Sequence, residues 1–461
     1  MAARIAPSFR RRSVLLISAS ASAPRRHGGR RRPRPAGSRR RPCRPAVTPL
    51  TVRYGTSDVR TGQMGPLLVN SAHDSATSGV FKLVVTGGGT GGHTYPALTA
   101  VRALQDRLAA SGRALEVLWI GTETGLEARV APAEGIAFTT VATGKIRRSA
   151  NPLKMLSAAN VRDMARVPLG VAQARKVISD FRPDVVLATG GYVAVPAGLA
   201  ARMCRRPLVL HEQTVRLGLA NRKLAGSATR IAVSSESTLA LLPESSREIA
   251  VVTGNPVRPQ VLSGHGEKAI EALGLSGFDG RRPTVYVTGG AQGSQQINEV
   301  VAEVLPWLLG YANVIHQCGP AHVETLRRQT ALLPAELAGR YHLTGFVGGE
   351  LPDVLALADV VISRSGAGTL AELTALGKAA VFIPLATSAG NEQMYNARHL
   401  HEAGAAVALL DEVTGQALAG ALEPLLADPS RRAAMADRAR AYGRPDAAER
   451  LVDVILSAAS G

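Results

Sequence analysis

The chain has 461 residues, of which 46% are hydrophobic and 19% are charged, so it can bury a large core and has room for two or three domains. Its net charge of +19 is concentrated at one end, because residues 1–80 contain 16 Arg, no Lys and two acidic residues, a balance of +14. The remaining residues carry only +5, and aromatic residues make up 4%, too few for a base-stacking surface. This composition argues against a folded nucleic-acid-binding protein, and we expect no nucleic-acid partner.

Residues 1–79 are rich in Arg, Pro, Gly and Ala and show no amphipathic period, so we predict a disordered basic tail. Three explanations stay open: a targeting segment, a basic arm for anionic surfaces, or a gene model that extends too far upstream. A non-enzymatic alternative makes the tail a nucleic-acid-binding arm, whose binding would depend steeply on salt and disappear when residues 1–80 are deleted. After the tail no apolar run approaches the ~20 residues that span a bilayer. Three isolated cysteines fit a reducing cytosol.

From Phe81 onward, short β-branched apolar runs alternate with helical stretches rich in Ala, Leu and Arg. The first series of predicted strands is Phe81–Thr86, Ala114–Ile120, Val185–Ala188, Leu208–His211, Arg230–Val233 and Ile249–Thr253. The second series is Thr284–Thr288, Ala312–Gln317, Tyr341–Thr344, Val360–Ser363 and Ala379–Pro384. Uniformly apolar strands separated by helices predict α/β domains, each a parallel sheet covered by helices on both faces.

The strand series restarts after Gly254-Asn255-Pro256-Val257-Arg258, so we place a domain boundary near residue 258. The prediction is a Rossmann-like domain over residues 80–258 and a second over residues 259–430. A C-terminal segment follows over residues 431–461. We expect this segment to hold one helix, Arg431–Ala458, that returns to the first domain.

The first motif, Gly87–His93 (GGGTGGH), follows a strand and opens a helix. Glycine allows a close backbone approach, and the helix start offers unpaired N–H groups to an anion. The motif also satisfies the dinucleotide-binding pattern, but that pattern needs an acid about 20 residues further on. The nearest suitable acid, Glu123, comes 31 residues after Gly92, which disfavours a nicotinamide cofactor. His93, at the mouth of this loop, is well placed for proton transfer near neutral pH.

The second half repeats this architecture. Gly289–Ser294 (GGAQGS) follows a strand, and Ser363–Leu373 (SRSGAGTLAEL) opens another helix whose start can face a diphosphate. Glu372 lies within the first two turns of that helix, close enough to accept hydrogen bonds from ribose hydroxyls. Two facing glycine-rich loops predict a cleft at the carboxyl ends of the strands.

Three further segments contribute polar groups: Pro384–Asn396 with Gln393, His211–Thr214 at the end of a strand, and Asn255–Arg258 at the joint between domains. The sequence has no Asp-x-Asp, the usual holder of a divalent cation on a sugar diphosphate. We therefore expect neither a metal nor a cofactor, and helix N-termini would neutralise the leaving group instead.

Together these residues resemble the MurG family of UDP-GlcNAc transferases. The motifs occur in the family's order from about Lys82 to Ala458: GGGTGGHTYPA, ATGGY, HEQT with GLANR, GNPVR, GGAQGS, SRSGAGTLAEL and NEQMYNA. The resemblance implies a GT-B fold, two Rossmann-like domains facing across a cleft, and an inverting reaction without metal.

The resemblance also implies roles for individual residues. His93 would be the general base, with Glu212 as the alternative; Glu372 would hold the ribose, and Val347 would contact the uracil through its backbone. The residues implied to contact UDP-GlcNAc are Thr90, Gly91, Gly92, Arg258, Val347, Ala367, Gly368, Thr369, Leu370, Ala371, Glu372 and Gln393.

Two positions depart from the family pattern within its substrate-binding motifs. Thr214 stands where the family usually has Asn, and Ala291 stands where it usually has Ser. Loss of the Ser hydrogen bond at Ala291 would weaken binding by ~0.5–1.5 kcal/mol unless water substitutes. These departures keep open an alternative, a MurG-like paralogue that glycosylates a natural product or another lipid.

The implied reaction transfers GlcNAc from UDP-GlcNAc to the C4 hydroxyl of MurNAc in lipid I, which gives lipid II for peptidoglycan. The enzyme would then be a peripheral protein on the cytoplasmic face of the cell membrane, with anionic phospholipids as partners. Lys145–Arg148 and Leu153–Leu156 have the mixed basic and apolar composition of such a contact, although a mobile basic loop explains them equally well.

Overall fold

The computed structural model describes residues 79–144 and 158–461, without the side chains of residues 158–164 and 389. All of these residues belong to one compact unit. The predicted tail and the two basic segments after residue 144 lie outside the described residues. Among the described helices, none is both long enough and apolar enough to cross a bilayer.

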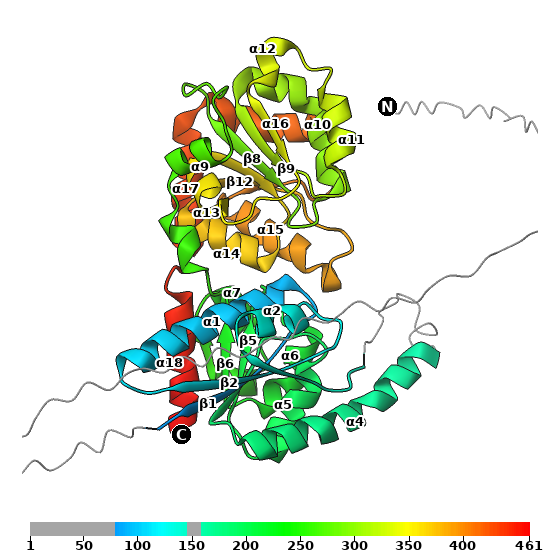
Figure 1. Cartoon of the computed structure of the whole chain (residues 1–461), viewed down its shortest axis with the longest axis vertical. Helices are drawn as coiled ribbons and strands as arrows, with labels where there is room; N and C mark the ends of the chain where they lie inside the picture. The colour runs from blue at the N-terminus through cyan, green and yellow to red at the C-terminus, as the bar shows by residue number, and fades with distance from the viewer. Residues whose placement is uncertain (1–78, 145–157) are drawn as a thin grey trace, which may run out of the picture. The chain divides into compact units, whose positions relative to one another are not determined.

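The first half is a seven-stranded parallel sheet in the order β3-β2-β1-β4-β5-β6-β7 (Figure 1). Its strands are β1 (Phe81–Thr86), β2 (Leu115–Gly121), β3 (Ala137–Thr140), β4 (Val185–Ala188), β5 (Leu208–Glu212), β6 (Arg230–Val233) and β7 (Ala250–Val252). The sequence did not predict β3. It is a short edge strand with partly exposed side chains, so it lacks the apolar run that marked the others.

Helices cover both faces of this sheet, so alternate residues of β1 are buried on opposite sides. Leu83 and Val85 share a core with residues of α1 and α18, whereas Val84 shares one with residues of α4 and α5. Figure 1 shows these helices beside the sheet. The helices of this half are α1 (Gly91–Ala110), α2 (Glu127–Ala133), α4 (Ala158–Phe181), α5 (Ala194–Met203), α6 (Leu219–Leu224), η1 (Ala225–Ser227), α7 (Glu236–Ala240) and α8 (Glu244–Arg247).

The second half is a six-stranded parallel sheet in the order β10-β9-β8-β11-β12-β13. Its strands are β8 (Thr284–Thr288), β9 (Asn313–Gln317), β10 (Tyr341–Thr344), β11 (Val360–Ser363), β12 (Ala379–Phe382) and β13 (Val407–Ala408). The two-residue strand β13 also escaped prediction, because two residues carry no periodicity. Two parallel-sheet α/β halves confirm the predicted fold class.

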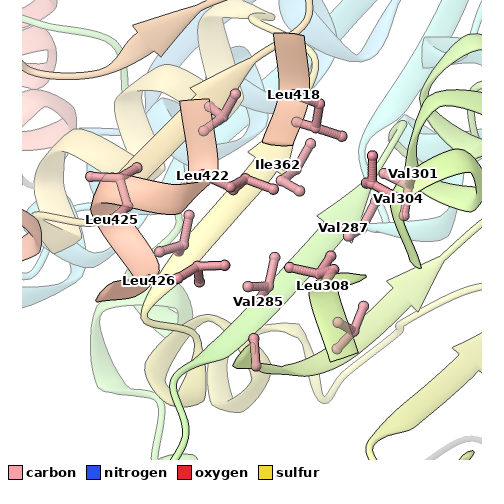
Figure 2. Close-up of a cluster of buried hydrophobic side chains, with 14 of the residues drawn as sticks. Val285, Val287, Val301, Val304, Leu308, Ile362, Leu418, Leu422, Leu425 and Leu426 are labelled. Carbon is pink, nitrogen blue, oxygen red and sulfur yellow. The ribbon is translucent and has the colours of Figure 1, made fainter. Parts of the chain in front are cut away.

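Both faces of the second sheet are buried as well. Figure 2 shows Val285 and Val287 of β8 packed against Leu308 of α10 and Leu422 of α16, while Tyr286 enters the opposite core. The helices here are η2 (Pro259–Ser263), α9 (Gly266–Ala272), α10 (Gln295–Tyr311), α11 (Val323–Thr330), α12 (Ala335–Ala338), α13 (Leu351–Leu357), α14 (Ala367–Leu376), η3 (Ala389–Asn391), α15 (Glu392–Glu402) and α16 (Gly415–Ala427).

The prediction of one long C-terminal helix is wrong. The segment forms α17 (Pro429–Tyr442) and α18 (Ala447–Ser460). Between them, Pro445 has no N–H to continue a helix. Gly443 comes so close to α14 that a Cβ there would lie 2.7 Å from the carbonyl oxygen of Thr374. The break lets α17 stay with the second sheet while α18 packs beside α1 on the first (Figure 1).

Strand order fixes where each sheet can bind a ligand. In the first sheet the order reverses between β1 and β4, and in the second between β8 and β11. At such a switch point the connections leave in opposite directions and open a crevice at the carboxyl ends of the strands. The glycine-rich loops follow β1 and β8, and the loops after β4 and β11 lie next to them.

Candidate active site

The loop after β1 leads directly into α1. Gly87 and Gly89 have φ of 153° and 83°, and Thr90 is the N-cap of α1. The Thr90 side chain makes no capping hydrogen bond, so the first N–H groups of the helix keep their donor capacity. A helix start of this kind favours an anion.

A buried carboxylate braces this loop. Glu127, at the start of α2, is 0% exposed and accepts hydrogen bonds from the Gly89 N–H (2.8 Å), the Thr122 N–H (3.0 Å) and the Thr122 hydroxyl (2.8 Å). A Cβ at Gly88 or Gly125 would overlap this carboxyl group, at 2.1 Å from its nearest atom. The sequence analysis did not single out Glu127; glycines on both sides of its binding space were the available signal.

The loop after β4 lies against the first one. The Thr189 hydroxyl donates to the carbonyl oxygen of His93 at 3.0 Å. Gly190 and Gly191 both have positive φ. A Cβ would lie 2.9 Å from the His93 ring at the first of these glycines and 2.6 Å from the Gly88 carbonyl oxygen at the second. The glycines of the ATGGY motif therefore allow contact between two loops that are about a hundred residues apart.

The His93 ring is half-buried, and its Nδ1 lies 3.0 Å from Oε1 of Gln213, which follows β5. Gln213 in turn contacts His211, a fully buried residue of β5. Desolvation lowers the pKa of His211 to about 4, although a hydrogen bond to the Gly254 carbonyl opposes this shift. His211 is therefore neutral at physiological pH.

Glu212, the alternative base of the sequence analysis, has both carboxylate oxygens engaged in hydrogen bonds. Its carboxylate is buried and already accepts hydrogen bonds from Thr214, Gly218 and Asn221 at 2.8 to 3.1 Å. The Thr214 hydroxyl also lies 2.6 Å from the Arg216 carbonyl oxygen, so this side chain makes its hydrogen bonds within the loop after β5. Glu212 acts as the anchor of the loop after β5.

In the second half, Arg364 ties the two switch-point loops together. It donates to Ser294 Oγ at 2.6 Å, to Gln296 Oε1 at 3.0 Å, and to the carbonyl oxygens of Ile383 and Pro384 at 2.9 and 3.0 Å. Partial burial lowers its pKa from the ordinary value, and four acceptors compensate the charge. Ala291 lies on the exposed turn of the same loop.

The start of α14 carries the sequence-predicted residues Ala367, Gly368, Thr369, Leu370 and Ala371 in its first turns. Gly366 is its N-cap and supplies no side-chain acceptor, and the first turn holds no acidic residue. The preceding residue, Ser365, donates to the Gln393 carbonyl at 2.7 Å, and its own carbonyl accepts from Asn396 at 3.2 Å. The helix start is thus held in place, and the N–H groups of Ala367, Gly368 and Thr369 have no hydrogen-bond partner among the described residues.

Glu372 and Arg258, 114 residues apart, form an ion pair in which Nε and Nη2 of the arginine each lie 2.8 Å from Oε1. Burial raises the pKa of Glu372, and the neighbouring guanidinium opposes that rise. The Oε2 atom has no hydrogen bond to any described residue, so the pair leaves this oxygen for a hydroxyl group.

Two residues predicted to contact the UDP-sugar, Val347 and Gln393, already use one of their polar groups in hydrogen bonds within the protein. The Val347 N–H donates to Gln317 Oε1 at 3.0 Å, and the same oxygen accepts from the Tyr286 hydroxyl at 3.1 Å. Of the backbone groups of Val347, only the carbonyl oxygen is therefore available for a hydrogen bond with the uracil. Gln393 Oε1 accepts from the Leu385 N–H at 3.0 Å, which leaves its amide nitrogen for a ligand.

A pocket lies between residues of the two halves. Gln213 and Asn255 line it from the first half, and Leu370, Ala371 and Asn396 line it from the second. Neither amide atom of Asn255 has a hydrogen-bond partner among the described residues, although the side chain is only 5% exposed. The described residues contain no group of three or more His, Cys, Asp or Glu that could hold a metal ion.

Comparison with known proteins decides the family. Residues 83–233 match the glycosyltransferase family 28 N-terminal domain, and residues 284–451 match the C-terminal domain of the same family. A curated relative from Listeria monocytogenes, named UDP-N-acetylglucosamine–N-acetylmuramyl-(pentapeptide) pyrophosphoryl-undecaprenol N-acetylglucosamine transferase, is 36% identical over 82% of this chain and 99% of its own length. The chain belongs to the MurG family of glycosyltransferases. A relative of the same name from Halalkalibacterium halodurans is 35% identical over 80% of this chain and 97% of its own.

Solved structures agree with the MurG assignment. The crystal structure of Acinetobacter baumannii MurG has a TM-score of 0.64 and 28% identity, and the match covers 82% of this chain and 99% of that one. A UDP-GlcNAc 2-epimerase from Neisseria meningitidis, solved with UDP-GlcNAc, has a TM-score of 0.56 over 82% of this chain and 100% of that one. Its 17% identity shows only that the fold is shared.

Proposed function

We propose that this MurG-family protein transfers GlcNAc from UDP-GlcNAc to the C4 hydroxyl of MurNAc in lipid I, and so forms lipid II for peptidoglycan. The names of the curated relatives, which align over nearly their whole length, support this reaction. The observation that carries the proposal is the pair of switch-point loops. Each loop lies at the carboxyl edge of its sheet. At each edge one helix, α1 or α14, begins without a side-chain cap, so its first N–H groups can bind an anion.

The reaction is a single displacement with inversion. His93 takes the proton of the C4 hydroxyl while that oxygen forms a bond to the anomeric carbon of GlcNAc. The bond from this carbon to the diphosphate oxygen breaks at the same time, its electron pair leaves with UDP, and the product linkage is β. His93 is the candidate base because its ring lies at the loop mouth with one nitrogen held by Gln213.

Negative charge grows on the diphosphate as it leaves, and the N–H groups of Ala367, Gly368 and Thr369 at the start of α14 would stabilise it. Fixed backbone donors at a helix start do this without a metal ion, because they are already oriented before the reaction. Thr90, Gly91 and Gly92 would supply equivalent donors from the first half.

The remaining contacts with UDP-GlcNAc are assigned to polar atoms that make no hydrogen bond within the described protein. Oε2 of Glu372 would accept from the ribose hydroxyls, with Arg258 holding the carboxylate in place. The carbonyl of Val347 and the amide nitrogen of Gln393 would contact the uracil and the sugar. Leu370 and Ala371 would line the pocket beside them.

The two departures from the family pattern give the alternative acceptor little support. Thr214 directs its hydroxyl at its own loop, and Ala291 stands on an exposed turn. A natural-product or other lipid acceptor therefore stays the second candidate, to be decided by substrate preference.

The acceptor is a lipid, so we place the protein at the cytoplasmic face of the cell membrane as a peripheral protein. Tyr95 and Tyr192, both more than 40% exposed, flank the His93 loops and would rest at the interfacial region. Flotation with vesicles of anionic phospholipid tests this contact. A variant with Lys145, Arg147, Arg148 and Lys154 changed to Gln should float less; equal flotation of both proteins would remove the lipid proposal.

The transfer reaction itself is tested with the purified full-length chain, UDP-GlcNAc and a lipid I analogue in EDTA. We expect lipid II analogue and UDP in equal amounts. Absence of transfer, transfer only after Mg²⁺ is added, or faster transfer to a soluble aglycone would each contradict the proposal.

A further inference from the structure

A continuous chain of hydrogen bonds connects the His93 ring to the backbone between the two halves. His93 Nδ1 lies 3.0 Å from Gln213 Oε1, and Gln213 Nε2 lies 3.0 Å from His211 Nδ1. His211 Nε2 lies 3.0 Å from the carbonyl oxygen of Gly254. The Glu212 carboxylate, bonded within its own loop, is not part of this chain.

The Gly254 carbonyl oxygen, at the end of this chain of hydrogen bonds, determines which nitrogen carries the hydrogen on each histidine. A carbonyl oxygen only accepts, so His211 Nε2 must carry a hydrogen. Since the buried His211 is neutral, its Nδ1 has a lone pair and accepts from the Gln213 amide nitrogen. The amide oxygen is then the atom that meets His93, and an oxygen there requires that His93 Nδ1 carries the hydrogen.

A second contact fixes the orientation of the amide independently of the ring protons. Gln213 Nε2 also donates to the His211 carbonyl oxygen at 3.0 Å. A reversed amide would place its oxygen against this carbonyl and leave a buried acceptor facing another acceptor, which is unfavourable. Two acceptors therefore hold the nitrogen toward His211 and the oxygen toward His93.

From this geometry we propose that Gln213 and His211 are positioning residues that select the Nδ1–H tautomer of His93, so that Nε2 presents the free lone pair. The inference deepens the proposed function and rests on His93 being the base. The ring lies so close to Gly190 that a Cβ there would be 2.9 Å from it, and its Nε2 has no hydrogen bond to any described residue. The titratable groups in the elements around the ring include His211, Glu212, Glu127, Tyr95 and Tyr192. The Glu212 carboxylate accepts from Thr214 and Gly218, and the Glu127 carboxylate accepts from Thr122 and from the Gly89 N–H of the loop after β1.

The tautomer is measured directly by ¹⁵N NMR of the full-length protein labelled at histidine, with His93→Gln to assign the signals. We expect a protonated Nδ1 and an unprotonated Nε2 for His93 at pH 8. A protonated Nε2 in the wild type would overturn the inference, whatever the variants do.

Two substitutions separate positioning from packing. Gln213→Met fills the same space without hydrogen bonds; we expect a mixture of tautomers and a kcat lower by ~10–100-fold, with little change in KM for UDP-GlcNAc. Gln213→Glu keeps an acceptor toward His93, and a proton on its other oxygen keeps a donor toward His211, so it should keep the tautomer and recover part of kcat. Equal losses in both variants with the wild-type tautomer retained would mean that Gln213 only packs, and would contradict the proposal.

These outcomes differ from a failure of the proposed function. If His93→Gln transfers GlcNAc at the wild-type rate while NMR shows the expected tautomer, the hydrogen-bond chain stands and the base is another group. UDP binding measured by calorimetry on each variant shows that the fold is retained.

Discussion

His93 and Glu212 differ in what already occupies their polar atoms. The Glu212 oxygens accept from donors in their own loop, whereas His93 has one nitrogen bonded to Gln213 and one with no bond to any described residue. A group whose lone pairs are all engaged cannot take a proton without losing those contacts. At the scale of single residues, this difference supports our proposal that the histidine is the base.

Substitution His93→Ala should therefore lower kcat by ~10²–10⁴-fold, the usual contribution of a general base, and leave KM for UDP-GlcNAc within a few fold. Steady-state UDP release with lipid I analogue measures both constants. His401→Ala, at an exposed position of α15, is the matched control and should keep wild-type turnover. Near-normal turnover of His93→Ala would move the base to another residue.

At the scale of elements, the glycines after β1 and β4 are required for two different reasons. Positive φ alone favours a residue without Cβ, and close approach of the neighbouring loop excludes any side chain. Gly112 and Gly191 separate these effects, because both have positive φ but only Gly191 has a neighbour: a Cβ there would lie 2.6 Å from the Gly88 carbonyl oxygen.

Gly112→Ala should cost about 1–2 kcal/mol of unfolding free energy from backbone strain alone and leave turnover unchanged. Gly191→Ala should cost more and also lower turnover, because relief of the overlap displaces the loop that carries His93. Urea unfolding and UDP release, measured on both variants, make the comparison. Equal stability losses with unchanged activity would show that the contact between the loops is unimportant.

At the scale of the whole molecule, α18 connects the C-terminus to the first sheet. Leu451 and Ile455 are fully buried in its core, while Arg107 of α1 reaches Glu449 and Asp453 on the surface at 3.1 Å. Ile455→Ala should therefore cost ~2–5 kcal/mol, and Arg107→Gln much less, because exposed ion pairs are screened by solvent and salt. Urea unfolding of the full-length variants distinguishes the two; equal costs would contradict this assignment of the contact energy.

Stability of the whole chain should also fall on mild acidification. His211 and His316 are buried, and desolvation lowers the pKa of each to about 4. Between about pH 6.5 and pH 4 the unfolded chain binds protons that the native protein does not, so each histidine costs about 2 kcal/mol by pH 5. Glu372 acts in the opposite direction near pH 5, because burial raises its pKa. The urea midpoint should drop from pH 7 to pH 5, and by less in His316→Gln; an unchanged wild-type midpoint would contradict this account.

The sequence by itself determined the features that repeat locally. Apolar β-branched runs predicted eleven strands that the structure contains, and the glycine-rich loops after Thr86 and Thr288 lie at the carboxyl edges of the sheets as expected. Anion binding at these loops stays a prediction. Local pattern suffices there because strand burial and loop conformation depend on neighbouring residues. Short edge strands such as β13 lack that pattern and were missed.

Only the tertiary structure decided which distant residues meet. Glu127 under the first loop, Gln213 against His93, Arg364 between two loops and α18 on the first sheet all join segments that are tens to hundreds of residues apart. No periodicity in the chain records such pairs, because they arise when β1 and β4, or β8 and β11, lie side by side. The chemistry of single residues was therefore readable from the sequence, while their hydrogen-bond partners, and with them the proton positions on His93, came from the fold.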